Sequence, residues 1–289
     1  MKYNSKSFLM RLGAGLSISV AFILISIKLC AFLWTGALSI LSSLIDSGFD
    51  LLAAVINAIA IHLALKPANA RYRFGHGKAE SIGAFIQSVF LCISAIFLLS
   101  EAYQHFKNNT ALEHLPAGVV VMVISTLLTL ALIYVQRRIV KKTQSMAILG
   151  DSVHYTGDTC MNIGVLISLF LSYWLKITWI DEVFAVCVAA YLLKSSLAIF
   201  LRVLGVLMDK ELDSPSRKAI QRAVLVDKNI HGIYRLKTRT TGSKSFVQFY
   251  AKINKDLNLQ QTHELCNRME KAVHEVLPNA EVIIHPVPK

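Results

Sequence analysis

Long apolar stretches separated by short polar segments fill the first two-thirds of the chain. An α-helix needs about 20 predominantly apolar residues to cross the hydrocarbon core of a bilayer, and each stretch reaches that length. We therefore predict six membrane-spanning helices, at residues 9–33, 36–65, 81–106, 115–136, 146–173 and 178–204. The second and fifth are the least uniformly apolar, which is expected of helices that face the interior of a bundle.

The pattern changes to that of a small soluble domain from about Asp209. SPSRKAIQRAVLVD predicts a helix with Ser214 as its N-cap and Pro215 at its first position. The alternating segments IYRLKTRTT and KSFVQFYAKI predict a β-hairpin with Gly242 in the turn. LQQTHELCNRMEKAVHEVL predicts a second helix and AEVIIHPV a last strand. The chain is thus expected to hold a six-helix membrane domain (1–208) and a cytoplasmic α+β domain of order αββαβ (209–289).

Charge follows the predicted spans. Lys and Arg gather before the first span, between the second and third, and between the fourth and fifth, whereas the alternate loops carry few. The positive-inside rule then places both termini in the cytoplasm. The formal net charge of +12 reflects this topology, because no basic stretch interleaved with aromatic residues suggests a nucleic-acid surface. The five cysteines are scattered without a C-x-x-C motif, which argues against a disulfide framework or a zinc ribbon.

Four ionisable residues interrupt the second and fifth apolar stretches. Asp46 and Asp50 are spaced i,i+4, as are His154 and Asp158, so each pair lies on one face of its helix. An isolated charge in hydrocarbon is costly and usually marks an ion or substrate path. Three carboxylates and one imidazole match a four-coordinate site for a divalent metal. The alternative is a buried polar network, but a divalent cation neutralises the carboxylates more directly.

Other polar residues in the spans have simpler interpretations. Asp151 is three residues before His154 and lies roughly on the same face. It is either a carboxylate that attracts cations at the cytoplasmic mouth of the path or a favourable charge at the helix N-terminus. We expect Asn57 and Asn162 to make interhelical hydrogen bonds, and Lys28 to extend toward the membrane interface.

Four segments together resemble the cation diffusion facilitator family, in particular its bacterial ferrous-iron and zinc efflux pumps: SLIDSGFD, FGHGKAES, GDSVHYTGD and VIIHP. The resemblance covers nearly the whole chain. It implies a homodimer in the inner membrane, joined through transmembrane helices and metallochaperone-like cytoplasmic domains, that exchanges divalent metal for protons. It places the transport site at Asp46, Asp50, His154 and Asp158. It also implies a charge interlock between Lys78 and Asp209.

The loop between the second and third spans departs from the family pattern. A metal site there normally uses an aspartate and two histidines, and this chain has Asn69, Tyr72 and His76 at those positions. Since one imidazole binds a divalent ion weakly, His76 is at most part of a weak site.

The cytoplasmic domain departs in the same way. Tyr234 and Tyr250 replace two histidines, and Val287 replaces an aspartate, of the binuclear site that the resemblance implies. His263 and His285 remain, and two scattered imidazoles rarely form a tight site. Metal sensing by this domain is therefore doubtful, although its fold is expected to persist.

The ligand types predict the mechanism. Carboxylate and imidazole bind metal only when deprotonated, so metal and protons compete for one site, with His154 as the expected proton carrier. Without a thiolate, copper(I) is not favoured, and Zn²⁺, Cd²⁺, Fe²⁺, Co²⁺ and Mn²⁺ remain candidates. We expect no organic cofactor. The chain has no G-x-x-x-x-G-K-[ST] motif, so we do not expect ATP hydrolysis.

Two other classes of function remain as alternatives. The first is a weakly transporting or non-transporting membrane scaffold that partners another metal transporter, which the altered loop and tail sites favour. The second is a membrane enzyme with a mononuclear metal. A catalytic metal needs an open position for water, and a closed four-ligand site in mid-membrane does not offer one. We therefore expect a transporter and not an enzyme.

Overall fold

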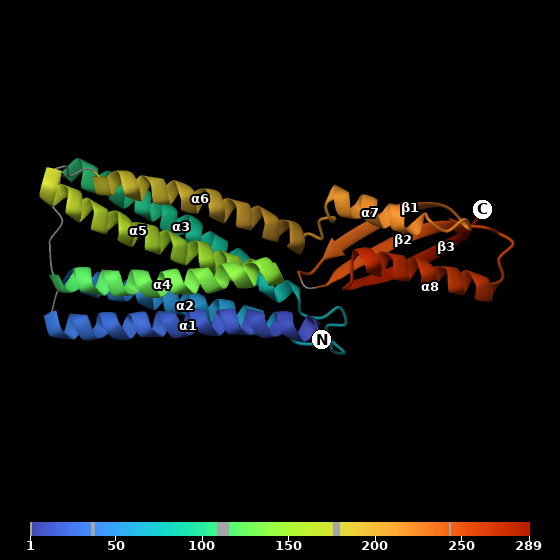
Figure 1. Cartoon of the computed structure of the whole chain (residues 1–289), viewed down its shortest axis with the longest axis horizontal. Helices are drawn as coiled ribbons and strands as arrows, with labels where there is room; N and C mark the ends of the chain where they lie inside the picture. Colours follow the sequence, from blue (N-terminus) through green and yellow to red (C-terminus); the bar gives the residue numbers. More distant parts are fainter. Residues whose placement is uncertain (1, 36–37, 109–115, 176–179, 243) are drawn as a thin grey trace. The chain divides into compact units, whose positions relative to one another are not determined.

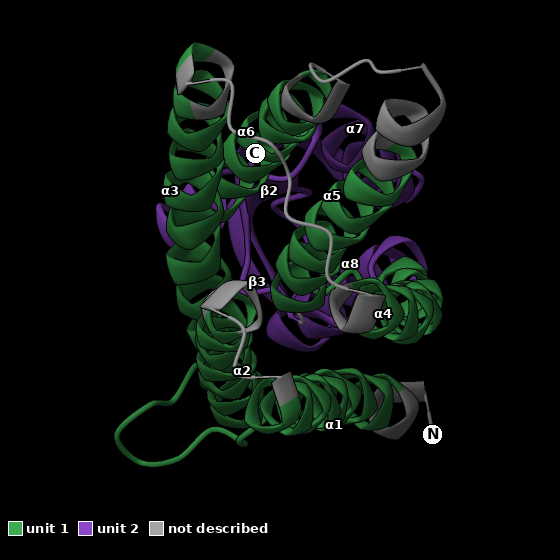
Figure 2. Ribbon diagram, turned by 90° about the vertical axis from the view of Figure 1, so that its left-hand side faces the viewer, with its two compact units in different colours: residues 1–203 green, residues 204–289 purple. Residues whose placement is uncertain are grey.

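The computed structural model describes residues 2–35, 38–108, 116–175, 180–242 and 244–289. The chain forms two compact units, residues 1–203 and 204–289, which are coloured separately in Figure 2. The change of composition at Asp209 lies shortly after this division. Each unit is described by itself below.

The first unit is helical. Its long helices are α1 (Lys2–Thr35), α2 (Leu38–Ala64), α3 (Lys78–Asn108), α4 (Pro116–Thr143), α5 (Met146–Leu175) and α6 (Ile180–Leu207), whose last turn belongs to the second unit (Figure 1). Within the described residues, five of them are long and apolar enough to cross a membrane: α1, α2, α3, α4 and α6. α5 carries the polar residues Asp151, His154 and Asp158 in its first half. The structure thus supports five apolar helices, and the sixth span stays a prediction.

The helices pack with α1 against α2 and α4, and with α5 against α3 and α4. Small residues permit the closest approaches. A Cβ atom on Gly83 of α3 would collide with Cβ of Ala60 on α2. A Cβ atom on Gly157 of α5 would lie 2.7 Å from a methyl group of Leu192 on α6. Such contacts between small residues are typical of helix pairs in membranes, where backbones approach closely.

The second unit is a two-layer α+β domain. It contains α7 (Ser214–Val224), β1 (Ile230–Thr240), β2 (Ser245–Ile253), α8 (Leu259–Val276) and β3 (Ala280–Pro288). β1 pairs antiparallel with β2, β2 pairs parallel with β3, and the sheet order is β1-β2-β3. The predicted αββαβ order is confirmed, and Gly242 follows β1 with a φ of 87°, a conformation that glycine adopts without strain.

The predicted N-cap of α7 is wrong by one residue. Asp213, with φ −60° and ψ 152°, is the extended residue before the helix, and Ser214 is already helical. Pro215 still falls in the first turn, where its missing N–H leaves no hydrogen bond unmade. The N-terminus of α8 has a capping box. The Asn258 side chain accepts from Gln261 N, and the Gln261 side chain accepts from Asn258 N.

One face of the sheet packs on the two helices of this unit. Phe249, Ala251 and Ile253 alternate along β2 toward Ile220 of α7 and Leu265 of α8, and all five are almost fully buried. The buried side chains of this cluster are apolar, so their packing can stabilise the domain without a bound ligand.

We therefore expect an isolated fragment of residues 209–289 to unfold cooperatively in the presence of EDTA. Phe249→Ala, which empties a site that is 2% exposed, should lower its free energy of unfolding by about 3–5 kcal/mol. Leu259→Ala, at a side chain that is 87% exposed, is the matched control and should change it little. Denaturant titration followed by circular dichroism measures both. A fragment that folds only with added zinc contradicts this expectation.

Candidate metal site

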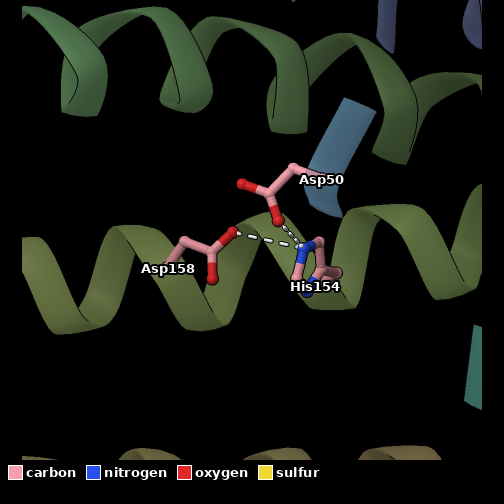
Figure 3. Close-up of side chains that lie close together, drawn as sticks. All are labelled: Asp50, His154 and Asp158. Carbon is pink, nitrogen blue, oxygen red and sulfur yellow. Dashed lines mark hydrogen bonds and ion pairs between the residues drawn. The ribbon is translucent and has the colours of Figure 1, made fainter. Parts of the chain in front are cut away.

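Three of the four predicted metal ligands come together between α2 and α5. The side chains of Asp50, His154 and Asp158 each offer a ligand atom, and these atoms all lie within 4.8 Å of one another (Figure 3). His154 Nε2 is 2.8 Å from Asp50 Oδ1 and 3.6 Å from Asp158 Oδ2. The first contact is a hydrogen bond. Among the described residues, this is the only group of three or more His, Cys, Asp or Glu side chains that could hold a metal.

Two helices position these side chains. His154 and Asp158 are one turn apart on α5, and Asp50 reaches them from α2. Asn57, two turns after Asp50, donates from Nδ2 to the carbonyl oxygen of Ala147 at 3.0 Å, which ties α2 to α5. The predicted interhelical hydrogen bond of Asn57 is thus confirmed. That of Asn162, which is partly buried, stays a prediction.

Asp46 is not part of the group. It lies one turn before Asp50 on α2, and its side chain is exposed in the isolated chain. An i,i+4 pair is separated by about 6 Å along the helix axis, so a shared face does not by itself place both carboxylates at one point. Its assignment as the fourth ligand stays a prediction.

Lys28 reaches across to α2, and its expected extension toward the membrane interface stays a prediction. Its Nζ donates to the carbonyl oxygen of Ser43 at 3.0 Å and to Oγ of Ser47 at 2.6 Å, so α1 contributes an ammonium group to α2 beside Asp50. The sequence did contain a signal. Ser43 and Ser47 repeat the i,i+4 spacing of Asp46 and Asp50, and the four residues form one polar stripe.

Asp151 is buried, with 3% of its surface exposed, so in this conformation it cannot attract cations from solvent. Nor does it lie in the first turn of α5, which begins at Met146. The carboxylate that serves this helix end belongs to Glu80 of α3. Its Oε1 accepts from Ser145 Oγ at 2.5 Å, and its carboxylate also accepts from the backbone N–H groups of Met146 and Ala147. Glu80 was missed because the contact joins two helices.

The Asp151 side chain instead joins α5 to other helices. Oδ2 accepts from Ser17 Oγ of α1 at 2.5 Å and from Gln136 Nε2 of α4 at 2.7 Å. The side chain of Gln87 of α3 hydrogen-bonds to Asp151 in either orientation of its amide. It donates to Oδ1 at 3.3 Å, or, turned over, accepts from the Asp151 N–H at 2.9 Å. Asp151 therefore ties α5 to three other helices, about one turn from His154.

The loop residues Asn69, Tyr72 and His76 make local contacts with one another. The side chain of Asn69 accepts from the N–H groups of Arg71 and Tyr72, so it shapes the turn. The rings of Tyr72 and His76 are 4.8 Å apart. A weak metal role for His76 stays a prediction.

The proposed interlock partners belong to different units. Lys78 begins α3 of the first unit. Asp209 lies in the second unit, where its Oδ2 accepts from Arg239 Nη1 at 3.3 Å. Their pairing therefore stays a prediction.

In the second unit, Tyr234, Tyr250 and His285 lie on adjacent strands. The two tyrosine rings are 5.3 Å apart, and the rings of Tyr250 and His285 are 4.7 Å apart. Phe249 and Ala251 point into the core, so Tyr250 between them lies on the face of the sheet away from the helices. His263 is exposed on α8. Tyr234, Tyr250 and His285 thus form an aromatic cluster at positions where the resemblance implies metal ligands.

Comparison with known proteins gives matches over nearly the whole chain. The family described as "Cation efflux transmembrane domain" matches residues 15–208, and "Cation efflux protein, cytoplasmic domain" matches residues 212–289. The chain is 38% identical over 284 residues to the cation-efflux pump FieF of Shewanella oneidensis, covering 97% of this chain and 95% of that protein. Proteins of the same name from Pectobacterium carotovorum and Klebsiella pneumoniae are 35% and 37% identical, over 97% and 93% of this chain and 93% and 90% of theirs.

The Asp151 connections predict a stability effect. Asp151→Ala removes the carboxylate that accepts from both Ser17 and Gln136, which then keep only their hydrogen bonds to Gly13 O and Ser17 Oγ. It should lower the free energy of unfolding of the full chain by about 1–3 kcal/mol. Asp151→Asn keeps the shape and an acceptor oxygen and should lower it less. Thermal unfolding in detergent measures the difference. Combining Asp151→Ala with Gln136→Ala should cost less than the sum of the single changes. Additive losses would mean that the two side chains are not coupled.

Proposed function

This chain belongs to the cation diffusion facilitator family, and we propose that it exports a divalent metal ion from the cytoplasm in exchange for protons. The observation that carries the proposal is the grouping of Asp50, His154 and Asp158 within a bundle of apolar helices. The named relatives are cation-efflux pumps, which agrees with a transporter rather than an enzyme.

The hydrogen bond between His154 Nε2 and Asp50 Oδ1 supports exchange of metal for protons. One proton lies between these two atoms, which are 2.8 Å apart, and both atoms are candidate metal ligands. A metal that binds both must displace that proton. Facing the cytoplasm, the site would load metal and release protons. Facing a more acidic exterior, it would take up protons and release metal.

Asp46 is the proposed fourth ligand. It lies about 40° around α2 from Asp50, one turn closer to the beginning of the helix. In this proposal its side chain turns along the shared stripe toward Asp50 when a cation enters. With three carboxylates and one imidazole, the loaded site suits Zn²⁺, Cd²⁺ or Fe²⁺, and Co²⁺ or Mn²⁺ with the same ligand types.

The proposed topology is that of a multi-pass protein of the inner membrane. α5 joins the five apolar helices as a sixth span, its polar residues facing the bundle interior. The basic residues between α2 and α3 and between α4 and α5 then lie in the cytoplasm with both termini and the second unit.

The proposed active form is a homodimer, joined through the transmembrane helices and the cytoplasmic domain. The open face of the sheet, with Tyr234 and Tyr250, is where relatives of this family are expected to bind metal. Tyrosine phenols, with an ordinary pKa near 10, are poor ligands at neutral pH. We propose that packing of aromatic rings takes the place of a metal bridge, so that this domain assembles without zinc.

A second candidate function is a scaffold that partners another transporter. The replaced ligands at Asn69, Tyr72, Tyr234 and Tyr250 favour it. The complete set of predicted ligands favours transport, because a scaffold gains nothing from three carboxylates that share one imidazole among apolar helices. Metal flux by the purified protein in proteoliposomes separates the two functions.

Replacement of the central ligands should abolish transport. Asp50→Ala and Asp158→Ala each remove one member of the close group, and zinc flux into proteoliposomes should fall to the background of empty vesicles. Asp46→Ala should retain more flux than either, because its carboxylate lies outside that group. Size-exclusion chromatography checks that each variant remains a folded dimer. Wild-type flux of zinc, cadmium, iron and cobalt in a folded Asp50→Ala variant would refute the site.

Transport should depend on the proton gradient. Because protons and metal compete for the same atoms, a more acidic exterior should accelerate metal export from the cytoplasmic side. His154→Ala should alter the pH dependence of any remaining flux. Stopped-flow measurement of zinc flux at several imposed pH gradients tests both statements. Flux that ignores the gradient in the wild type would refute antiport, whereas an unchanged profile in His154→Ala would refute only the role of that residue.

A further inference from the structure

Lys28 is the one basic side chain that the structure brings from α1 to the polar stripe of α2, as far as the described residues go. It lies within the apolar segment Lys6–Trp34 of α1. Its Nζ donates to the carbonyl oxygen of Ser43 at 3.0 Å and to Oγ of Ser47 at 2.6 Å. Ser47 is 1% exposed, so the ammonium group is held against the packed helices. A cation among apolar helices is costly unless nearby negative charge compensates it.

The position of Ser47 places that cation beside the candidate metal site. Ser43, Asp46, Ser47 and Asp50 fall within about 100° of the helix circumference. Ser47 is only about 60° around α2 from Asp50 and about 4.5 Å from it along the axis. The charge of Lys28 acts on the carboxylates of Asp50, Asp158 and Asp46.

The charges of these groups suggest what the ammonium does. Asp46, Asp50 and Asp158 together carry three negative charges when ionised. A divalent metal supplies two positive charges and Lys28 supplies one, so the loaded site is neutral when the His154 imidazole is uncharged. Without Lys28 the loaded site would keep a net negative charge among apolar helices, and it would hold the metal more tightly.

We propose that Lys28 is a fixed cation of the transport site, which completes the charge balance of the metal-bound state and weakens metal binding enough for release. This inference rests on the proposed function and adds a residue from α1 to a site whose predicted ligands come from α2 and α5. The two hydrogen bonds to α2 keep the ammonium beside the site, so that it acts by charge and not as a ligand.

If Lys28 acts by its charge, its substitution by a neutral residue should strengthen metal binding, whereas structural damage would weaken it. Loss of a residue that merely joins α1 to α2 would loosen the site and weaken metal binding. Loss of a repelling cation strengthens it. Lys28→Gln removes the charge and keeps an N–H donor, Lys28→Met removes both and keeps the chain length, and Lys28→Arg keeps the charge. Lys194→Gln, at an exposed lysine of α6, is the control for a change of net charge alone.

Calorimetric titration of the purified full-length variants with Zn²⁺, at low ionic strength and mildly alkaline pH, tests the inference. Lys28→Gln and Lys28→Met should bind zinc on the order of 10-fold more tightly than the wild type, while Lys28→Arg and Lys194→Gln should match it. In proteoliposomes the neutral variants should show a lower KM and a lower maximal flux, since release becomes slow. Folded neutral variants that bind zinc with unchanged or weaker affinity would overturn the inference.

The Asp158→Asn variant, titrated with zinc in the same way, distinguishes a wrong role for Lys28 from a wrong metal site. If Asp158→Asn weakens zinc binding and the Lys28 variants do not strengthen it, the metal site stands and the role of Lys28 is wrong. If Asp158→Asn binds zinc as tightly as the wild type, the site itself is wrong and the inference falls with it.

Discussion

The first unit depends on how it accommodates ionised groups among apolar helices. Carboxylates in hydrocarbon persist only when a cation, a proton or a set of hydrogen-bond donors faces them. The described residues place basic side chains and neutral donors beside these carboxylates. Asp50 faces the imidazole of His154, Asp151 and Glu80 face neutral donors, and the ammonium of Lys28 lies on the same stripe of α2 as Asp50. At the proposed metal site, three carboxylates share one imidazole and one ammonium group. A divalent cation can therefore neutralise more negative charge there than at Asp151 or Glu80.

The buried carboxylates outside the site have a different task, which is to fix α5. Glu80 accepts hydrogen bonds from Met146 and Ala147, Asn57 donates to the carbonyl oxygen of the same Ala147, and Asp151 follows after one more turn. All these contacts precede His154 along the helix. The first turns of α5 are thus attached to α1, α2, α3 and α4, and the ligand atoms project from the turn that follows. Small errors in the placement of α5 would separate His154 from Asp50, because a hydrogen bond tolerates only a few tenths of an ångström.

The helices, the αββαβ order and the i,i+4 pairs could be predicted from the sequence, because each depends on the periodicity of a single segment. Sequence reasoning placed His154 and Asp158 on the same face of α5 for that reason. It could not foresee that Lys28 turns to α2 or that Glu80 reaches α5, since both contacts depend on the rotation of one helix against another. The position of Asp46 outside the close group has the same origin, because a shared helix face fixes Cα positions and leaves the rotamer open. The N-cap of α7 was misplaced for a local reason, as Asp213 and Ser214 are both good caps.

The contact between Gly83 of α3 and Ala60 of α2 restricts how the bundle can move. At this point the two backbones are already separated by no more than a hydrogen atom on one side and a methyl group on the other. Sliding α2 along α3 by one turn in one direction would bring the larger Ile56 to the position of Ala60. Close-packed interfaces change between discrete arrangements rather than deforming smoothly. We therefore expect α2 and α3 to move together, so that a displacement of Asp50 involves both helices.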